Sequence, residues 1–91
     1  MLHLVAYDLG AQRRNYQPLW NHLTELQATQ ILESVWLLEN ATTSLAVRDD
    51  LNRFIDANDF LWVSEIISNS AWRGIKLTLQ QADALWGLGR Y

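Results

Sequence analysis

Cysteine is absent from this chain of 91 residues, proline occurs once, and histidine occurs only twice. The lack of cysteine excludes disulfides and thiolate metal sites, and His3 and His22 show no spacing typical of a metal site. There is no glycine-rich phosphate loop, and no apolar run approaches the roughly 20 residues of a membrane span. The N-terminus lacks the basic segment of a signal peptide, so we expect a cytoplasmic protein without a membrane segment.

Positive charge is also scarce, since seven Lys and Arg stand against ten Asp and Glu and give a net charge of −3. This balance argues against broad, nonspecific nucleic-acid binding, although a local basic patch stays open. By contrast, an apolar content of 49% and five tryptophans are high for a chain of single-domain length. The surplus fits either a dense core or a surface buried in a homodimer, and we favour the homodimer because small domains often gain stability by association.

Apolar periodicity and turn residues divide the chain into strands and helices. The predicted strands are 2–8, about 29–33, about 35–40 and 60–67, and the predicted helices are roughly 15–27 and 44–56. One long bent strand is the alternative to the middle pair, because the break at Glu33-Ser34 lacks a hairpin signal. Asn15 and Thr43 are the expected N-caps of the two helices. A further strand over 72–77 and a short helix opening at Thr78 are expected at the C-terminal end.

This order predicts an α+β domain with a ferredoxin-like βαββαβ sandwich, in which an antiparallel sheet carries two helices on one face. The core is expected over 1–67, and the C-terminal strand and helix form an extension over 72–91 of the same single domain. In the first strand Val5 and Tyr7 point to one face, whereas Leu4, Ala6 and Asp8 point to the other. Since both sets are mostly apolar, the face without helices predicts a partner.

Asp8 is the first candidate for chemistry, because it ends an apolar strand. If the helix-free face is a two-fold interface, two Asp8 carboxylates would come together. Like charges that close repel each other unless a cation lies between them, and Mg²⁺ binds through one or two carboxylates while keeping its waters. The structural alternative is that Asp8 accepts backbone N–H groups at the strand end.

Arg13 and Arg14 are the only adjacent basic pair, one short loop after Asp8. The guanidinium group matches phosphate in a bidentate way, so the pair could hold a phosphate near Asp8. The alternative is a solvated loop with an ion pair to the first helix. Glu65 interrupts an apolar strand, and it is either a buried acid paired with an arginine or a second carboxylate near Asp8.

Several short motifs resemble the CRISPR-associated Cas-two proteins and their relative, virulence-associated protein D. The motifs are the strand end Val-Ala-Tyr-Asp at 5–8, the arginine pair at 13–14, Ser-Val-Trp at 34–36, and Asp-Ala-Asn-Asp at 56–59 before Phe-Leu-Trp-Val at 60–63. Ser-Val-Trp is similar to the family's Ser-Val-Phe. The chain departs from the family in its acidity, its shortage of lysine and its Trp/Gly-rich tail.

The resemblance implies a ferredoxin-like homodimer whose strand 72–77 crosses to the other subunit. It also implies that Asp8 of each subunit binds one Mg²⁺ or Mn²⁺ ion, since some members are metal-dependent nucleases. The first hypothesis is therefore a metal-dependent endonuclease acting on RNA or DNA, with Asp8 as catalytic and metal residue and with Arg13 and Arg14 binding phosphate. The second is a non-catalytic dimeric module that docks a protein partner, as other members serve structural roles.

Overall fold

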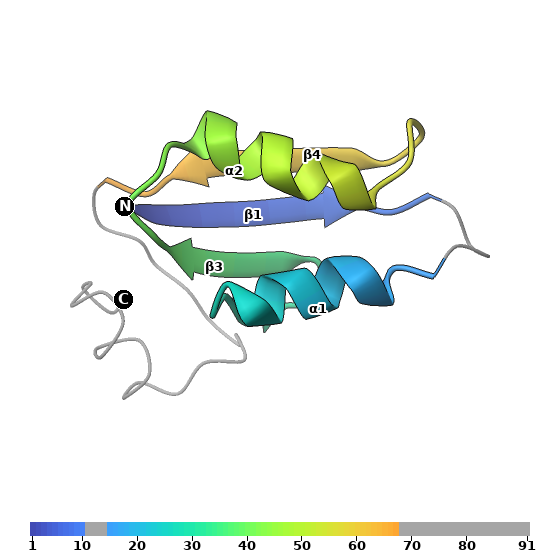
Figure 1. The fold of residues 1–91 in the computed structure, drawn as a ribbon, viewed down its shortest axis with the longest axis horizontal. Helices are drawn as coiled ribbons and strands as arrows, with labels where there is room; N and C mark the ends of the chain where they lie inside the picture. The colour runs from blue at the N-terminus through green and yellow to red at the C-terminus, as the bar shows by residue number, and fades with distance from the viewer. Residues whose placement is uncertain (11–14, 68–91) are drawn as a thin grey trace.

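A computed structural model describes residues 1–10 and 15–67 of the chain, which form an α+β fold with a four-stranded antiparallel sheet and two helices (Figure 1). In chain order the elements are β1 (Leu2–Asp8), α1 (Gln17–Glu25), β2 (Thr29–Leu32), β3 (Val35–Glu39), α2 (Ser44–Leu51), the 3-10 helix η1 (Asn52–Phe54) and β4 (Phe60–Glu65). The strand order is β2-β3-β1-β4. In the described part of the chain, every helix is too short or too polar to cross a bilayer.

β1 is an inner strand because its side chains are largely apolar on both faces. It pairs antiparallel with β3, where Val5 lies opposite Trp36, and with β4, where Asp8 lies opposite Phe60. The segment 28–40 forms two strands rather than one bent strand, as predicted, and the Glu33-Ser34 turn joins them. The Tyr7 backbone N–H donates to the Ser34 carbonyl at 3.1 Å, which holds this turn against the end of β1.

α1 is shorter at both ends than the predicted span of 15–27. The helix begins at Gln17, whose backbone N–H donates to Asn15 Oδ1 at 3.0 Å, while Tyr16 holds the N-cap position and its side chain does not cap the helix. At the other end Gln27 adopts a left-handed φ of 64°. The Gln27 and Ala28 N–H groups then bond carbonyls of the last turn, which closes the helix as a Schellman motif usually does with glycine.

α2 confirms its predicted cap but not its predicted length. Thr43 Oγ1 accepts the backbone N–H of Ala46 at 3.1 Å. The helix stops at Leu51 instead of reaching residue 56, and it continues as η1. Arg53 Nε donates to the Asp50 carbonyl at 3.1 Å, so a side chain satisfies a carbonyl that a longer helix would have bonded.

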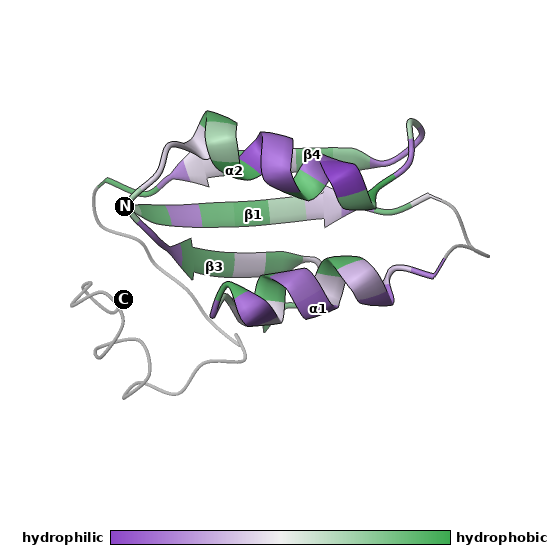
Figure 2. Cartoon of the chain, viewed as in Figure 1, coloured by the Kyte–Doolittle hydropathy of each residue, from purple (hydrophilic) through white to green (hydrophobic). Residues whose placement is uncertain are grey.

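Both helices pack on one face of the sheet, and this layer holds the main core. Leu19 and Leu23 of α1 and Val47 and Leu51 of α2 are buried together with Val5 and other sheet residues. Figure 2 shows β1 and β3 as largely hydrophobic ribbons, whereas the helices alternate between hydrophobic and hydrophilic residues. The two-layer arrangement follows from this pattern, because each helix has only one apolar stripe to bury.

The opposite side of the sheet, here called the outer face, is covered by no helix of the described residues. It carries a smaller apolar cluster of Leu2, Ile31 and Leu37, with Leu4 packed against it. Towards the Asp8 end of the strands, the outer face becomes more open to solvent. The expected strand 72–77, the helix from Thr78 and the extension 72–91 lie outside the described residues.

His3 is a fully buried polar residue between β1 and the loop that leads to α2. Its Nδ1 lies 2.9 Å from Ser44 Oγ, and its Nε2 lies 2.9 Å from Asn40 Oδ1 and 3.0 Å from the Thr42 carbonyl. Both ring nitrogens of His3 therefore have hydrogen-bond partners within the protein, as a buried polar residue requires.

Candidate functional site

Asp8 lies at the end of β1 with an exposed side chain on the outer face. Its cross-strand neighbour on β4 is Phe60, and Trp62 lies opposite Ala6 one pair further along. Phe60 and Trp62 are 70% and 67% exposed. A shallow hollow of about 340 Å³ lies among these side chains and Leu61. The candidate carboxylate therefore lies at the edge of an exposed aromatic patch.

The structural alternative for Asp8 receives no support from its surroundings. Within residues 1–10 and 15–67, no backbone or side-chain donor bonds its carboxylate. Asp8 is thus free, in the described part of the chain, to accept bonds from a cation or a ligand.

The prediction that Glu65 supplies a second carboxylate beside Asp8 is wrong. β1 and β4 are neighbours, as expected, but they run antiparallel, so Glu65 lies opposite His3 at the far end of the pair. Glu65 is also exposed, so it is not a buried acid paired with arginine. Among the described residues, no three His, Asp or Glu side chains gather as metal ligands. Glu65 therefore does not supply a second carboxylate for Asp8.

Arg13 and Arg14 lie outside the described residues, but the residues on either side of their loop share one buried acceptor. Asp59, which is 9% exposed, accepts the Gly10 backbone N–H at 2.8 Å and the Tyr16 hydroxyl at 2.8 and 2.9 Å. The same carboxylate also accepts the backbone N–H of residue 56 at 2.8 Å. From the sequence, the segment around Asp59 was expected only to form a turn. The one sequence feature that could have indicated this buried acceptor was an acidic residue directly before an apolar strand.

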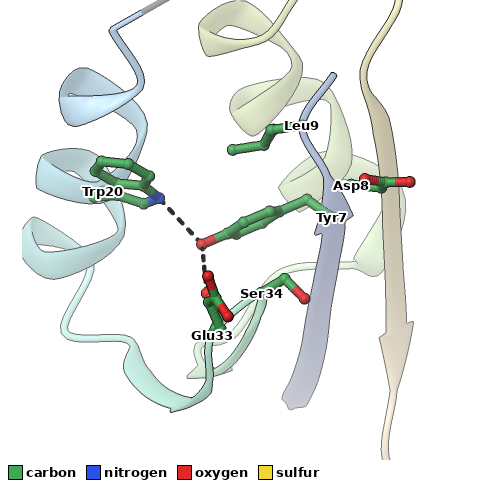
Figure 3. A pocket seen from close by; sticks show the side chains of 6 residues that line it. All are labelled: Tyr7, Asp8, Leu9, Trp20, Glu33 and Ser34. Atoms are coloured by element: carbon green, nitrogen blue, oxygen red, sulfur yellow. Dashed lines mark hydrogen bonds between the residues drawn. The ribbon is translucent and has the colours of Figure 1, made fainter. Parts of the chain in front are cut away.

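A second hollow, on the helix side of the sheet, was not predicted. It has a volume of about 420 Å³ and is lined by Tyr7, Asp8, Leu9, Trp20, Glu33 and Ser34 (Figure 3). The Tyr7 hydroxyl accepts hydrogen bonds from Trp20 Nε1 at 3.1 Å and from Trp36 Nε1 at 3.0 Å. Figure 3 shows the Tyr7 ring and the Asp8 carboxylate pointing to opposite sides of β1, as strand geometry requires.

The two hollows differ in the chemistry that they offer. The hollow on the outer face presents the exposed Asp8 carboxylate beside exposed aromatic rings, and carboxylate oxygens are ligands that hard cations prefer. The helix side presents fixed aromatic rings and oxygen acceptors. No family model matches the sequence.

Proposed function

We propose that the chain works as a Cas-two-like homodimer of ferredoxin-like fold, in which the outer faces pack together and a pair of Asp8 carboxylates holds one Mg²⁺ or Mn²⁺ ion. The activity we propose is metal-dependent hydrolysis of RNA or DNA phosphodiesters. Arg13 and Arg14, next along the chain, would bind the phosphate.

The observation that carries this proposal is the exposed aromatic patch beside the Asp8 carboxylate, which accepts no bond from residues 1–10 and 15–67. About two thirds of the Phe60 and Trp62 side chains is open to solvent. Burying the exposed part of each ring favours association by about 2–4 kcal/mol before the entropy of association is subtracted. A two-fold contact through this patch would bring the Asp8 side chains of both copies to one interface.

The arrangement of the sheet supports the ferredoxin-like part of the proposal. Its strand order of β2-β3-β1-β4, with every neighbouring pair antiparallel, agrees with a split βαβ arrangement. The resemblance at residues 5–8 and 34–36 supports the Cas-two-like part, since the first motif ends β1 and the second begins at the turn beside it.

The chemistry of Asp8 fits a hard divalent cation. Its oxygens are exposed and accept no bond from the described residues, and magnesium sites commonly use one or two carboxylates. When bound, such a cation polarises a phosphoryl oxygen and lowers the pKa of a bound water. The two carboxylates of the dimer would fix its position, and the arginine pair would orient the phosphate by bidentate hydrogen bonds.

Cleavage of labelled single- and double-stranded RNA and DNA, with Mg²⁺ or Mn²⁺, tests the catalytic part of the proposal. We expect Asp8→Asn to abolish cleavage, while Glu65→Gln, which removes an exposed carboxylate from the other end of the same strand pair, leaves it unchanged. Equal cleavage by the wild type and Asp8→Asn would point to a contaminating nuclease and refute a catalytic Asp8.

Sedimentation of the full chain tests the dimer separately. We expect Trp62→Lys to yield a monomer, because the substitution places a charge in the proposed interface. Leu45→Lys is the matched control, since Leu45 is also a large exposed apolar residue but lies on α2, away from the outer face. A wild-type monomer at micromolar concentration, or a dimer that withstands Trp62→Lys, contradicts the proposed interface.

A second candidate function is a non-catalytic dimeric module that docks a protein partner. The observation in its favour is that, among the described residues, no group of three or more His, Asp or Glu side chains is placed to hold a metal ion. A dimer that binds neither Mg²⁺ nor Mn²⁺ by calorimetry and cleaves no nucleic acid would establish this alternative over the nuclease.

A further inference from the structure

The helix-side hollow is built around the hydroxyl group of Tyr7. Trp20 from α1 and Trp36 from β3 each direct an indole N–H to this oxygen, at 3.1 and 3.0 Å. The Tyr7 hydroxyl in turn lies 3.4 Å from the Glu33 carbonyl. Three aromatic side chains from three elements are therefore linked at one atom, which fixes the walls of the hollow before any ligand arrives.

The donors of this hollow are already used within the protein. Both indole N–H groups donate to Tyr7, and the Gln30 side-chain amide donates to the Glu33 carbonyl at 3.0 Å. No arginine or lysine of the described residues lines the hollow. An anionic ligand would therefore find neither a free indole donor nor a described basic side chain there.

The acceptors, in contrast, remain open. The Glu33 carboxylate lines the hollow and bonds no donor of the described residues. Ser34 contributes a hydroxyl on the same side, and Figure 3 shows Glu33 below the Tyr7 hydroxyl with Ser34 next to it. Glu33 is exposed in the turn between β2 and β3, and its negative charge, beside the Tyr7 and Trp20 rings that line the same hollow, favours a positively charged ligand through hydrogen bonds and cation–π attraction.

An adjoining hollow extends the site along the sheet. It has a volume of about 370 Å³, is lined by Trp20, Gln30, Glu33 and Trp36, and shares Trp20 and Glu33 with the first hollow of about 420 Å³. Each volume lies within the range of small-molecule sites, which is roughly 300–1,000 Å³. Glu33 and the aromatic side chain of Trp20 thus line both hollows.

We propose that this aromatic hollow binds a small organic cation with N–H donors, an alkylguanidinium or alkylammonium compound, through the Glu33 carboxylate. The cation donates to Glu33 and Ser34, and its alkyl stem packs on Trp20 and Tyr7. Asp8 also lines this hollow, but its carboxylate points to the opposite side of β1, so the cation is held by Glu33 and not by the proposed metal ligand.

The test uses the ¹⁵N-labelled full chain and agmatine, which carries a guanidinium and an ammonium group on one alkyl stem. The indole Nε1–H signals of Trp20 and Trp36 are assigned with Trp→Phe variants and followed by NMR as agmatine is added. We expect both signals to shift in a saturable way, because their hydrogen bonds lie in the wall of the site. We expect 1-butanol, a neutral alkyl compound, to leave them in place.

Glu33→Gln keeps the size of the side chain and removes its charge. We expect it to weaken agmatine binding about tenfold, the usual cost of losing a charged hydrogen-bond partner. Glu65→Gln is the control, because it removes an exposed carboxylate from a remote place on the sheet and should leave the affinity unchanged. The proposal is overturned if agmatine shifts neither indole signal, if 1-butanol shifts them equally, or if Glu33→Gln binds as tightly as Glu65→Gln.

Discussion

The carboxylate of Asp59 offers the sharpest test of how this fold is held together. It is 9% exposed, and it accepts the Tyr16 hydroxyl at 2.8 and 2.9 Å and the Gly10 backbone N–H at 2.8 Å. These bonds tie the start of β4 to both the residue after β1 and the residue before α1. Segments 43 and 49 residues apart in the chain thus meet at one side chain.

Removing either partner should destabilise the protein substantially. Tyr16→Phe deletes one hydrogen bond to a buried charge, which costs about 1.5–3 kcal/mol. Asp59→Asn replaces an acceptor by an amide donor that faces other donors, so we expect a loss of about 2–4 kcal/mol. Because the hydroxyl–carboxylate bond is lost in both variants, the double variant should be less destabilised than the sum, by about 1–2 kcal/mol.

Urea unfolding, followed by tryptophan fluorescence, measures all four proteins of this double-mutant cycle. The cycle cancels whatever else each side chain contacts, so the coupling energy reports on the pair. Asp49→Asn is the matched control, since this aspartate is largely exposed and pairs with Arg48 on the surface; we expect it to cost less than about 0.5 kcal/mol. Additive losses for Tyr16→Phe and Asp59→Asn would refute the proposed role of this bond.

Three further substitutions give distinct outcomes. Thr43→Ala removes the α2 cap and should cost about 1 kcal/mol, measured as a lower midpoint in urea. Tyr7→Phe leaves two indole N–H groups without their acceptor and should cost about 1–3 kcal/mol, with both indole NMR signals displaced. Partial burial raises the pKa of Asp50, but hydrogen bonds and charge from His22 and Arg53 outweigh it and hold the pKa below its ordinary value. The stabilisation that the Asp50 carboxylate gains from these contacts is present above about pH 4 and is lost as the pH falls through the pKa of Asp50 in the folded protein. The Tm of Asp50→Asn should therefore fall less steeply with acid than that of the wild type.

The strands were predictable from their apolar runs, although the break between the two middle strands carried no hairpin signal. The bounds of β1 agree with the prediction, and the break at Glu33-Ser34 divides β2 from β3 as expected. The helix ends were less predictable, since tertiary contacts set them. Gln27 takes a left-handed conformation that usually belongs to glycine, and Arg53 bonds a carbonyl at the end of α2. Neither the left-handed conformation of Gln27 nor the hydrogen bond of Arg53 corresponds to a recognisable sequence pattern.

Single residues of the candidate site could be predicted from the sequence, but which side chains lie next to one another could not. Asp8 was identified by its place at a strand end, whereas the meeting of Tyr7, Trp20 and Trp36 depends on how α1 lies over the sheet. Their sequence separations of 13 and 29 residues match no local period. Distant aromatic residues were therefore interpreted as core or interface anchors, although three of their polar atoms converge on one hollow.

The alternation of β1 separates the two proposed activities in space. Asp8 points to the outer face and Tyr7 to the helix side, with the sheet between them (Figure 3). A second copy that covers Phe60 and Trp62 would bury the Asp8 side and leave the Glu33 hollow open to solvent. A ligand held by Glu33 on the helix side could consequently bind each copy of the dimer, and Glu33→Gln should leave both dimer formation and cleavage intact.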